Sequence, residues 1–431
     1  MALPKAKEDA TATRLAGLSL PADAGWSRAA REDALARLQA QGVPQRRDEY
    51  WRFTNPSAFT APEVAEAPSR DLPDEIPLGA EADRLTVVFT DGVFDPDASD
   101  ALEGEGMEIA RLAGAPDIHW ARDLYGTLEA RGQDPVDRPL AALNTAFATD
   151  GVLIRVSGKV TRPVSIVYRH RDARSDVLLH HVIRIDADAA LTLVEAGPAG
   201  ARSNIVIEAD IAQGGAFHHV RDQGREHDRS ATTAGFARLG EAAVYKSFTL
   251  SANGALTRNE HVIECLGNGG IAHVAGAAIG DAAAHPFHHD DTVFITHDAL
   301  DCESRQVFKK VLKNGAVGVF QGKILVREGA QKTDGYQISQ SLLLDEDSQF
   351  LAKPELEIYA DDVACSHGST TGAIDEEALF YLRSRGVPEG PATDLLVLAF
   401  LAEALDEIDD PDIAGVLRDQ LSGWLSRHAT R

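Results

Sequence analysis

The chain has 431 residues, a quarter of them charged, and a formal net charge of −25 at pH 7. This length allows two or three domains with a large core. The acidic balance argues against nucleic acid and against an anionic membrane surface as partners, because both are bound through clustered Lys and Arg. The chain has three widely spaced cysteines, Cys265, Cys302 and Cys365, which fit a reducing compartment better than a disulfide framework.

The chain shows no targeting signal that would place it outside the cytoplasm. Its first residues, MALPKAKEDATATRL, lack the apolar segment of a signal peptide. The most apolar run is LLVLAFLA at residues 395–402, which is far shorter than the roughly 20 residues of a membrane-spanning helix. These features predict a cytoplasmic protein that does not enter a membrane.

Residues 1–150 are predicted to form an N-terminal helical and mixed region. Residues 27–42 carry Ala34, Leu35 and Leu38 at helical spacing, and Gly42 and Pro44 end the helix. A second helix is expected around residues 120–128 and a third around residues 140–147, where leucine and aromatic residues recur at the same spacing.

Residues 151–374 are predicted to form a long β region. Short stretches rich in β-branched residues, such as VLIRV, VSIVY and NIVIEAD, alternate apolar with polar positions and are separated by Gly, Asp and Asn turns. Almost no helical pattern lies between them, which favours a solenoid or a large sandwich. No fixed-period repeat is visible, so periodicity alone does not choose the solenoid.

The segment KPELEIYADDVACSHGSTTGAIDEEALFYLRSRGV, at 353–387, ends this region. Cys365 and His367 are two positions apart, so their side chains share one face of an extended strand. A thiol and an imidazole are ligands suited to iron or an iron–sulfur cluster. From Asp375 the pattern becomes helical, and residues 375–431 are predicted to form a C-terminal helical region.

Histidine is concentrated in the β region, with twelve of the fifteen between His170 and His297. The pairs at 180–181 and 218–219 should point to opposite faces of their strands and cannot chelate one metal. The group between His285 and His297 is either a metal site or a set of stacked and solvated histidines. Cys265 and Cys302 are interpreted as buried structural thiols.

Four segments carry a resemblance to the SufB/SufD family of the Suf iron–sulfur cluster assembly system. They are the segment at 353–387, RRDEYWRFTNPSAF at 46–59, DRPLAALNTAFATDGVLIRV at 137–156 and RQVFKKVLKNGAVGVFQGKILVREGAQKTDGYQISQSLLL at 305–344. Within the family the chain is more similar to SufD-type subunits. A SufB-type chain would be expected to carry additional cysteines, including one near Ser339.

The resemblance implies a mainly β protein with a right-handed parallel β-helix core flanked by helical regions. It implies a non-catalytic scaffold subunit that pairs with SufB, binds the ATPase SufC through its C-terminal helices, and can form a homodimer in isolation. A β-helix has open end strands, and an unpaired strand edge can accept another chain.

The resemblance also assigns the metal-binding residues. His367 and, with it, Cys365 are expected to contribute to a nascent cluster shared with SufB. Because two ligands do not complete a cluster site, no cofactor should bind stably to this chain alone. Two alternatives stay open: a SufB-type subunit that bears the cluster, or a metal-dependent or carbohydrate-active β-helix enzyme using Glu357, Asp361 and Asp362. Whether the complex binds flavin is undecided.

Overall fold

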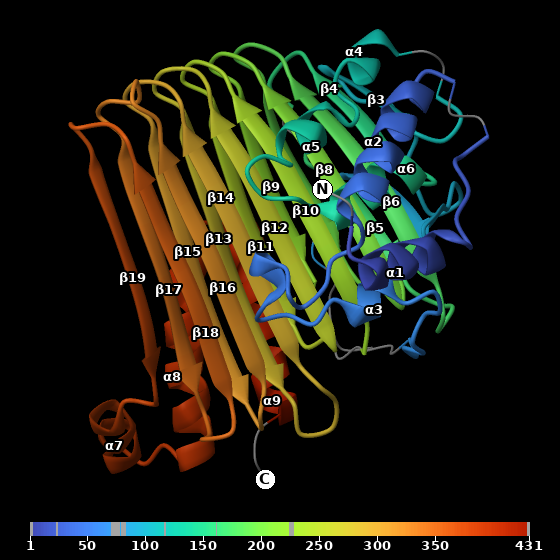
Figure 1. Cartoon of the computed structure of the whole chain (residues 1–431). Helices are drawn as coiled ribbons and strands as arrows, with labels where there is room; N and C mark the ends of the chain where they lie inside the picture. The colour runs from blue at the N-terminus through green and yellow to red at the C-terminus, as the bar shows by residue number, and fades with distance from the viewer. Residues whose placement is uncertain are drawn as a thin grey trace.

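The strands of the chain alternate between two facing sheets (Figure 1). The computed structural model describes residues 3–22, 25–69, 78, 83–115, 118–160, 162–223 and 228–428. One sheet has ten strands in the order β19-β17-β15-β13-β11-β9-β7-β5-β1-β2, and the other has nine in the order β18-β16-β14-β12-β10-β8-β6-β4-β3. Each turn of the chain therefore adds one strand to each sheet, which is the topology of a β-helix.

In the part of the chain that the structure describes, sixteen strands of the solenoid follow one another with no helix between them. They are β4 (Val152–Val156), β5 (Val164–Arg169), β6 (Asp176–Ile185), β7 (Ala190–Ala196), β8 (Arg202–Ile211), β9 (Ala216–Asp222), β10 (Ser230–Leu239), β11 (Val244–Ala252), β12 (Leu256–Cys265), β13 (Ile271–Asp281), β14 (His288–His297), β15 (Glu303–Lys313), β16 (Val317–Val326), β17 (Asp334–Leu343), β18 (Gln349–Ile358) and β19 (Ala364–Gly372).

The predicted parallel β-helix is confirmed, and its geometry explains why the sequence shows no repeat. Successive turns pair in parallel, but the separation between paired residues varies. Ser230 pairs with Leu256, 26 positions later, whereas Thr257 pairs with His289, 32 positions later. The ladder needs only matching strands, so turns of unequal length are tolerated and no constant period appears in the sequence.

The N-terminal part is a mixture of short elements, as expected. They are α1 (Lys5–Leu15), α2 (Arg28–Gln41), the 3-10 helix η1 (Glu49–Trp51), α3 (Ser57–Thr60), β1 (Leu85–Thr90), β2 (Val93–Phe94), β3 (Met107–Arg111), α4 (His119–Arg122), α5 (Thr127–Arg131) and α6 (Pro139–Phe147). The single helix expected over 120–128 is wrong. Gly126 has a left-handed backbone, with φ 73°, and this separates α4 from α5.

N-terminal segments lie over part of the outer face of the nine-stranded sheet (Figure 1). The Asn144 amide of α6 donates to the carbonyl oxygens of Leu179 and Asn204 on β6 and β8. Further along the sheet, the Tyr50 hydroxyl of η1 donates to Glu355 of β18 at 2.7 Å. The segment at 46–59, which carried part of the family resemblance, thus spans several strands of this sheet.

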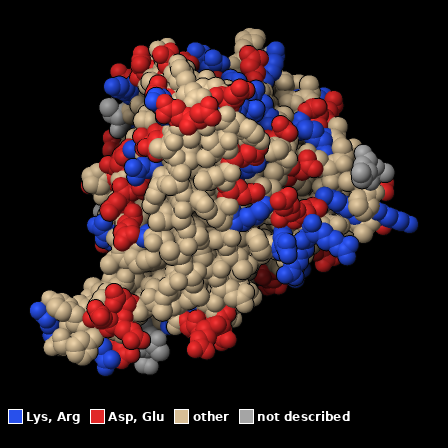
Figure 2. Space-filling model, turned by 60° about the vertical axis from the view of Figure 1, so that its left-hand side comes forward, with Lys and Arg blue, Asp and Glu red and all other residues tan. Residues whose placement is uncertain are grey.

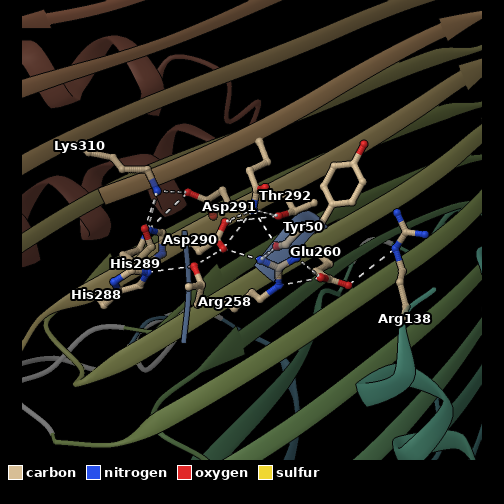
Figure 3. A network of polar contacts seen from close by, with 12 residues as sticks. Tyr50, Arg138, Arg258, Glu260, His288, His289, Asp290, Asp291, Thr292 and Lys310 are labelled. Atoms are coloured by element: carbon tan, nitrogen blue, oxygen red, sulfur yellow. Dashed lines mark hydrogen bonds and ion pairs between the residues drawn. The ribbon is translucent and has the colours of Figure 1, made fainter. Parts of the chain in front are cut away.

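A buried ion-pair network fixes that segment (Figure 3). Arg258 of β12 is ion-paired with Asp290 and Glu260, and it donates to the Tyr50 carbonyl oxygen at 3.0 Å. The Thr54 hydroxyl donates to Asp290. Burial alone would raise the pKa of the Asp290 carboxyl, but Arg258 and Thr54 lower it below its usual value. Removing one partner of such a network would leave a buried charge uncompensated.

The outer face of the ten-stranded sheet is covered by the C-terminal helices α8 (Glu389–Leu405) and α9 (Pro411–His428). Their apolar side chains form one cluster with residues of β11, β13 and β15, including Val397, Leu401, Leu417, Phe248 and Ile279. Helix α7 (Glu376–Ser384) has no buried residue and projects from the body (Figure 1). Among the described residues no helix is long and apolar enough to cross a membrane.

The interior between the sheets combines an apolar core with buried polar residues. His181, His219 and His261 point inward and are at most 4% exposed. His219 hydrogen-bonds Glu195 at 2.7 Å, and His181 lies 3.0 Å from the Tyr168 hydroxyl. Burial lowers the pKa of His181 to about 4 and that of His261 to about 3, because the charged imidazolium is poorly solvated there.

We expect these two histidines to make the protein less stable in mild acid. The unfolded chain binds protons below pH of about 6.5, whereas folded His181 and His261 stay neutral until much lower pH. The free energy of unfolding should therefore fall as the pH drops from about 6.5 toward 4, by up to about 1.4 kcal/mol per pH unit for each histidine. Urea unfolding across this range measures the slope, and His261→Gln should reduce it.

Ile154→Val is the matched control. Its side chain is fully buried between the sheets, has no titratable group and is paired with neither histidine in the ladder. The control should shift stability by a constant amount at every pH. Equal slopes for wild type and His261→Gln would contradict the expectation.

Candidate metal-binding residues at the open end and in the interior

The solenoid ends in two strands whose outer edges have no partner strand among the described residues. These are β18 and β19, which stand last in their sheets. Neither contains a buried residue, whereas most positions of β14 and β16 are buried. Figure 2 shows a continuous, largely uncharged surface on the side of the molecule that carries this end. Free backbone groups beside such a surface can accept another strand.

Cys365 and His367 lie on β19, as predicted, and on the same side of the strand. Cys365 pairs with Gly335 of β17, and His367 pairs with Gln337. Gly335 and Gln337 are buried and face the interior, so the two residues of β19 face the interior of the last turn. Because no further turn covers them, Cys365 is half-buried and His367 is exposed.

The two side chains are free to bind a ligand. Among the described residues the His367 ring makes no hydrogen bond or ion pair, and the buried Gln337 amide beneath it has no hydrogen-bond partner. Burial raises the pKa of the Cys365 thiol, so it is less acidic than a typical cysteine. An incoming metal would lower this pKa by binding the thiolate. The pair offers one sulfur and one nitrogen, and the remaining ligands must come from elsewhere.

A second group of side chains that offer metal-ligand atoms lies inside the solenoid. Cys265, His297 and Cys302 each offer a ligand atom, and these atoms all lie within 4.8 Å of one another. Cys265 and His297 are paired neighbours at the ends of β12 and β14, and Cys302 lies just before β15. The neighbouring Cys265 thiol and, to a smaller extent, the His297 ring lower the pKa of Cys302 below its ordinary value. All three side chains are buried.

The predicted histidine group does not form one metal site. His288 is 2.9 Å from the Thr54 hydroxyl on the outer face, and His289 accepts from Lys310 at 2.8 Å on the inner face. The His285 Nδ1 atom lies 3.2 Å from a carboxylate oxygen of Asp228. Only His297 among the four joins a metal-binding group, and its partners are the cysteines. Sequence reasoning missed this group because Cys265 lies 32 positions before His297, and only the pairing of β12 with β14 brings the two side chains together.

The carboxylates of the enzyme alternative do not form a shared acidic site. Glu357 is ion-paired with Lys323 at 2.6 Å, and Asp362 is ion-paired with Lys332. Ser339, where a SufB-type chain would be expected to have a cysteine nearby, is buried on β17 and donates to the Ser369 hydroxyl at 3.1 Å. The position thus holds a hydroxyl pair and no thiol.

Comparisons with known proteins agree with this architecture. A family model described as "SUF system FeS cluster assembly, SufBD core domain" matches residues 168–400. The chain is 27% identical to the iron-sulfur cluster assembly protein SufD of Escherichia coli, over 87% of this chain and 88% of the relative. It is 26% identical to SufD of Bacillus subtilis, over 86% of each chain, and 26% identical to a SufBD family protein of Synechocystis, over 91% and 90%.

The accessibility of the three cysteines gives a test of the open end. Cys365 is half-buried at the open end, whereas Cys265 and Cys302 are buried. We expect a thiol reagent to modify one cysteine per native chain quickly and the other two only after unfolding, since reaction needs access to the sulfur. Cys365→Ser should abolish the fast phase, and a fast phase of two or three thiols would contradict this assignment.

Proposed function

Because the chain belongs to the SufBD family of iron–sulfur cluster assembly proteins and is SufD-like within it, we propose that it is a scaffold subunit that pairs with a SufB and a SufC ATPase. The observation that supports this most is the open end of the solenoid, where β18 and β19 leave a strand edge unpaired beside an interior thiol and imidazole. A second β-helix can add to such an edge through backbone hydrogen bonds.

In this proposal the nascent cluster is cargo held at the junction of the two solenoids. His367 supplies an imidazole and Cys365 a thiolate, and SufB supplies the ligands that complete the site. The isolated chain then retains no cluster, and it has no catalytic residue of its own. The hydroxyl pair at Ser339 and Ser369 favours the SufD-type role over a cluster-bearing SufB-type role, because it offers no soft ligand.

The surface that we assign to SufC is helix α7. Its N-terminus is capped by Asp375, which accepts from the backbone N–H groups of Glu377 and Ala378, so the helix is well defined although it buries nothing. Phe380 is 73% exposed and Tyr381 is 54% exposed. Exposed aromatic residues on a projecting helix are typical anchors of a protein–protein contact.

His367→Ala tests the shared cluster site. The side chain is exposed and makes no hydrogen bond within the described residues, so the variant should fold and assemble with both partners. Loss of a ligand should lower cluster formation by the assembled complex about tenfold or more. Co-purification with tagged SufB and SufC, followed by cluster assembly measured by visible absorbance, gives both readouts. Cys365→Ser should lower cluster formation less than His367→Ala does.

Ser366→Ala is the matched control for this experiment. Ser366 lies between the two proposed ligands on β19 and is exposed, but it points to the other side of the strand. This variant should assemble clusters at the wild-type rate. If His367→Ala also does so, the residue is an ordinary strand histidine and the site assignment fails, although family membership stands.

The double substitution Phe380→Ala and Tyr381→Ala tests the docking of SufC. Both side chains are exposed, so the fold should be unaffected, and loss of two aromatic anchors should weaken binding about 10- to 100-fold. Titration calorimetry with purified SufC measures the change. Val93→Ala removes an apolar side chain that is 69% exposed on β2, and it should leave the affinity unchanged. Unaltered affinity of the double variant would exclude α7 as the docking surface.

A further inference from the structure

The group of Cys265, His297 and Cys302 has no task in the scaffold role described above. It lies inside the solenoid, on strands that precede the open end, and its residues differ from the pair on β19. We propose that these three side chains bind one thiophilic divalent ion of the Zn²⁺ type, which ties two successive turns of the solenoid together. The site belongs to this chain alone and does not require a partner subunit.

The neighbours of the group in the ladder are apolar. Cys265 is flanked by Leu239 on β10 and His297 by Val326 on β16, and all four residues are fully buried. A histidine in such a row has to lose its hydration, which is unfavourable unless its polar atoms find partners. A bound metal ion supplies that partner, because it is coordinated by the two cysteine sulfurs and by the imidazole nitrogen at the same time.

The orientation of the His297 ring fits a ligand. Its Nε2 atom lies 2.8 Å from the Ser304 hydroxyl, which fixes the ring. Its Nδ1 atom is buried and has no hydrogen-bond partner among the described residues. Ligating histidines usually have one nitrogen hydrogen-bonded to a neighbouring group while the other binds the metal. The ring therefore has the arrangement of a metal ligand before any ion is bound.

The donor set selects the class of ion. Two cysteine sulfurs and one imidazole nitrogen suit Zn²⁺ and related soft or borderline ions, whereas Mg²⁺ and Ca²⁺ take oxygen ligands. Three protein ligands leave one position of a tetrahedron for a fourth ligand. Leu266, which follows Cys265, and Leu300, in the connection that carries Cys302, are exposed, so this corner of the solenoid lies at the protein surface.

The position of the group explains what the ion would do. Cys265 ends β12, His297 ends β14, and Cys302 lies in the connection from β14 to β15. An ion bound to all three would join one turn to the next and also fix the corner between the two sheets. Its expected effect is structural, because metal binding to the folded state raises the stability of that state.

The experiment uses the full chain purified anaerobically with a reductant, stripped with a chelator and then loaded with Zn²⁺. We expect one Zn²⁺ per chain by elemental analysis after desalting, and a higher thermal midpoint than for the stripped protein. Co²⁺ in place of Zn²⁺ should give the absorption bands of a thiolate-bound tetrahedral ion. Neither readout depends on cluster assembly or on SufB and SufC.

Substitutions assign the bound ion to this group. Cys302→Ser and His297→Gln should each lower the retained Zn²⁺ at least tenfold and remove the Co²⁺–thiolate bands. Cys365→Ser changes the third cysteine of the chain. This variant should keep one Zn²⁺ per chain and should show the same Co²⁺–thiolate absorption bands as the wild type. Circular dichroism of each variant checks the fold, and where Cys302→Ser unfolds, His297→Gln supplies the same comparison.

Three results would overturn the proposal. The first is a wild-type chain that retains no Zn²⁺, and the second is equal retention by wild type and His297→Gln. The third concerns the sulfurs themselves: if protein prepared with reductant and then unfolded without it exposes only one reactive thiol, Cys265 and Cys302 form a disulfide. A disulfide would leave no thiolate for the metal.

Discussion

The parallel pairing of each turn with the next is the constraint on which the rest of this structure depends. Backbone hydrogen bonds between turns satisfy every interior strand on both sides, and they fix which residues lie side by side. The last turn has no successor among the described residues, so β18 and β19 keep one unpaired edge each. The open end arises because the series of paired strands stops at β18 and β19. The residues that would face the interior of a further turn are therefore accessible there.

The two sheets are protected on their outer faces by different parts of the chain. The nine-stranded sheet is covered by N-terminal segments through a buried network around Arg258 and Asp290, and the ten-stranded sheet by α8 and α9 through apolar contacts. Neither covering pairs with the outer edges of β18 and β19, which stand last in their sheets (Figure 1). The body is thus stabilised independently of the surface that we assign to a partner solenoid.

The same ladder brings together two groups of side chains that offer metal-ligand atoms, and the two groups differ in accessibility. At the open end, Cys365 and His367 follow each other along one strand and remain accessible, which suits a site completed by another chain. In the interior, Cys265 and His297 come from neighbouring strands and Cys302 from a connection, and all are buried. In our proposals the accessible pair serves a cluster that is passed on, and the buried group serves an ion that stays within the fold.

The sequence alone determined the β region, the helices that flank it, and the shared face of Cys365 and His367, because alternation and helical spacing are local properties. The resemblance to the SufB/SufD family indicated a solenoid where the residue pattern did not. The turns vary in length from 26 to 32 residues, so the sequence shows no constant period. Only the tertiary structure joined His297 to Cys265 and Cys302, and separated His288 from His289. Register between turns decides such contacts, and it depends on turn lengths that no local pattern specifies.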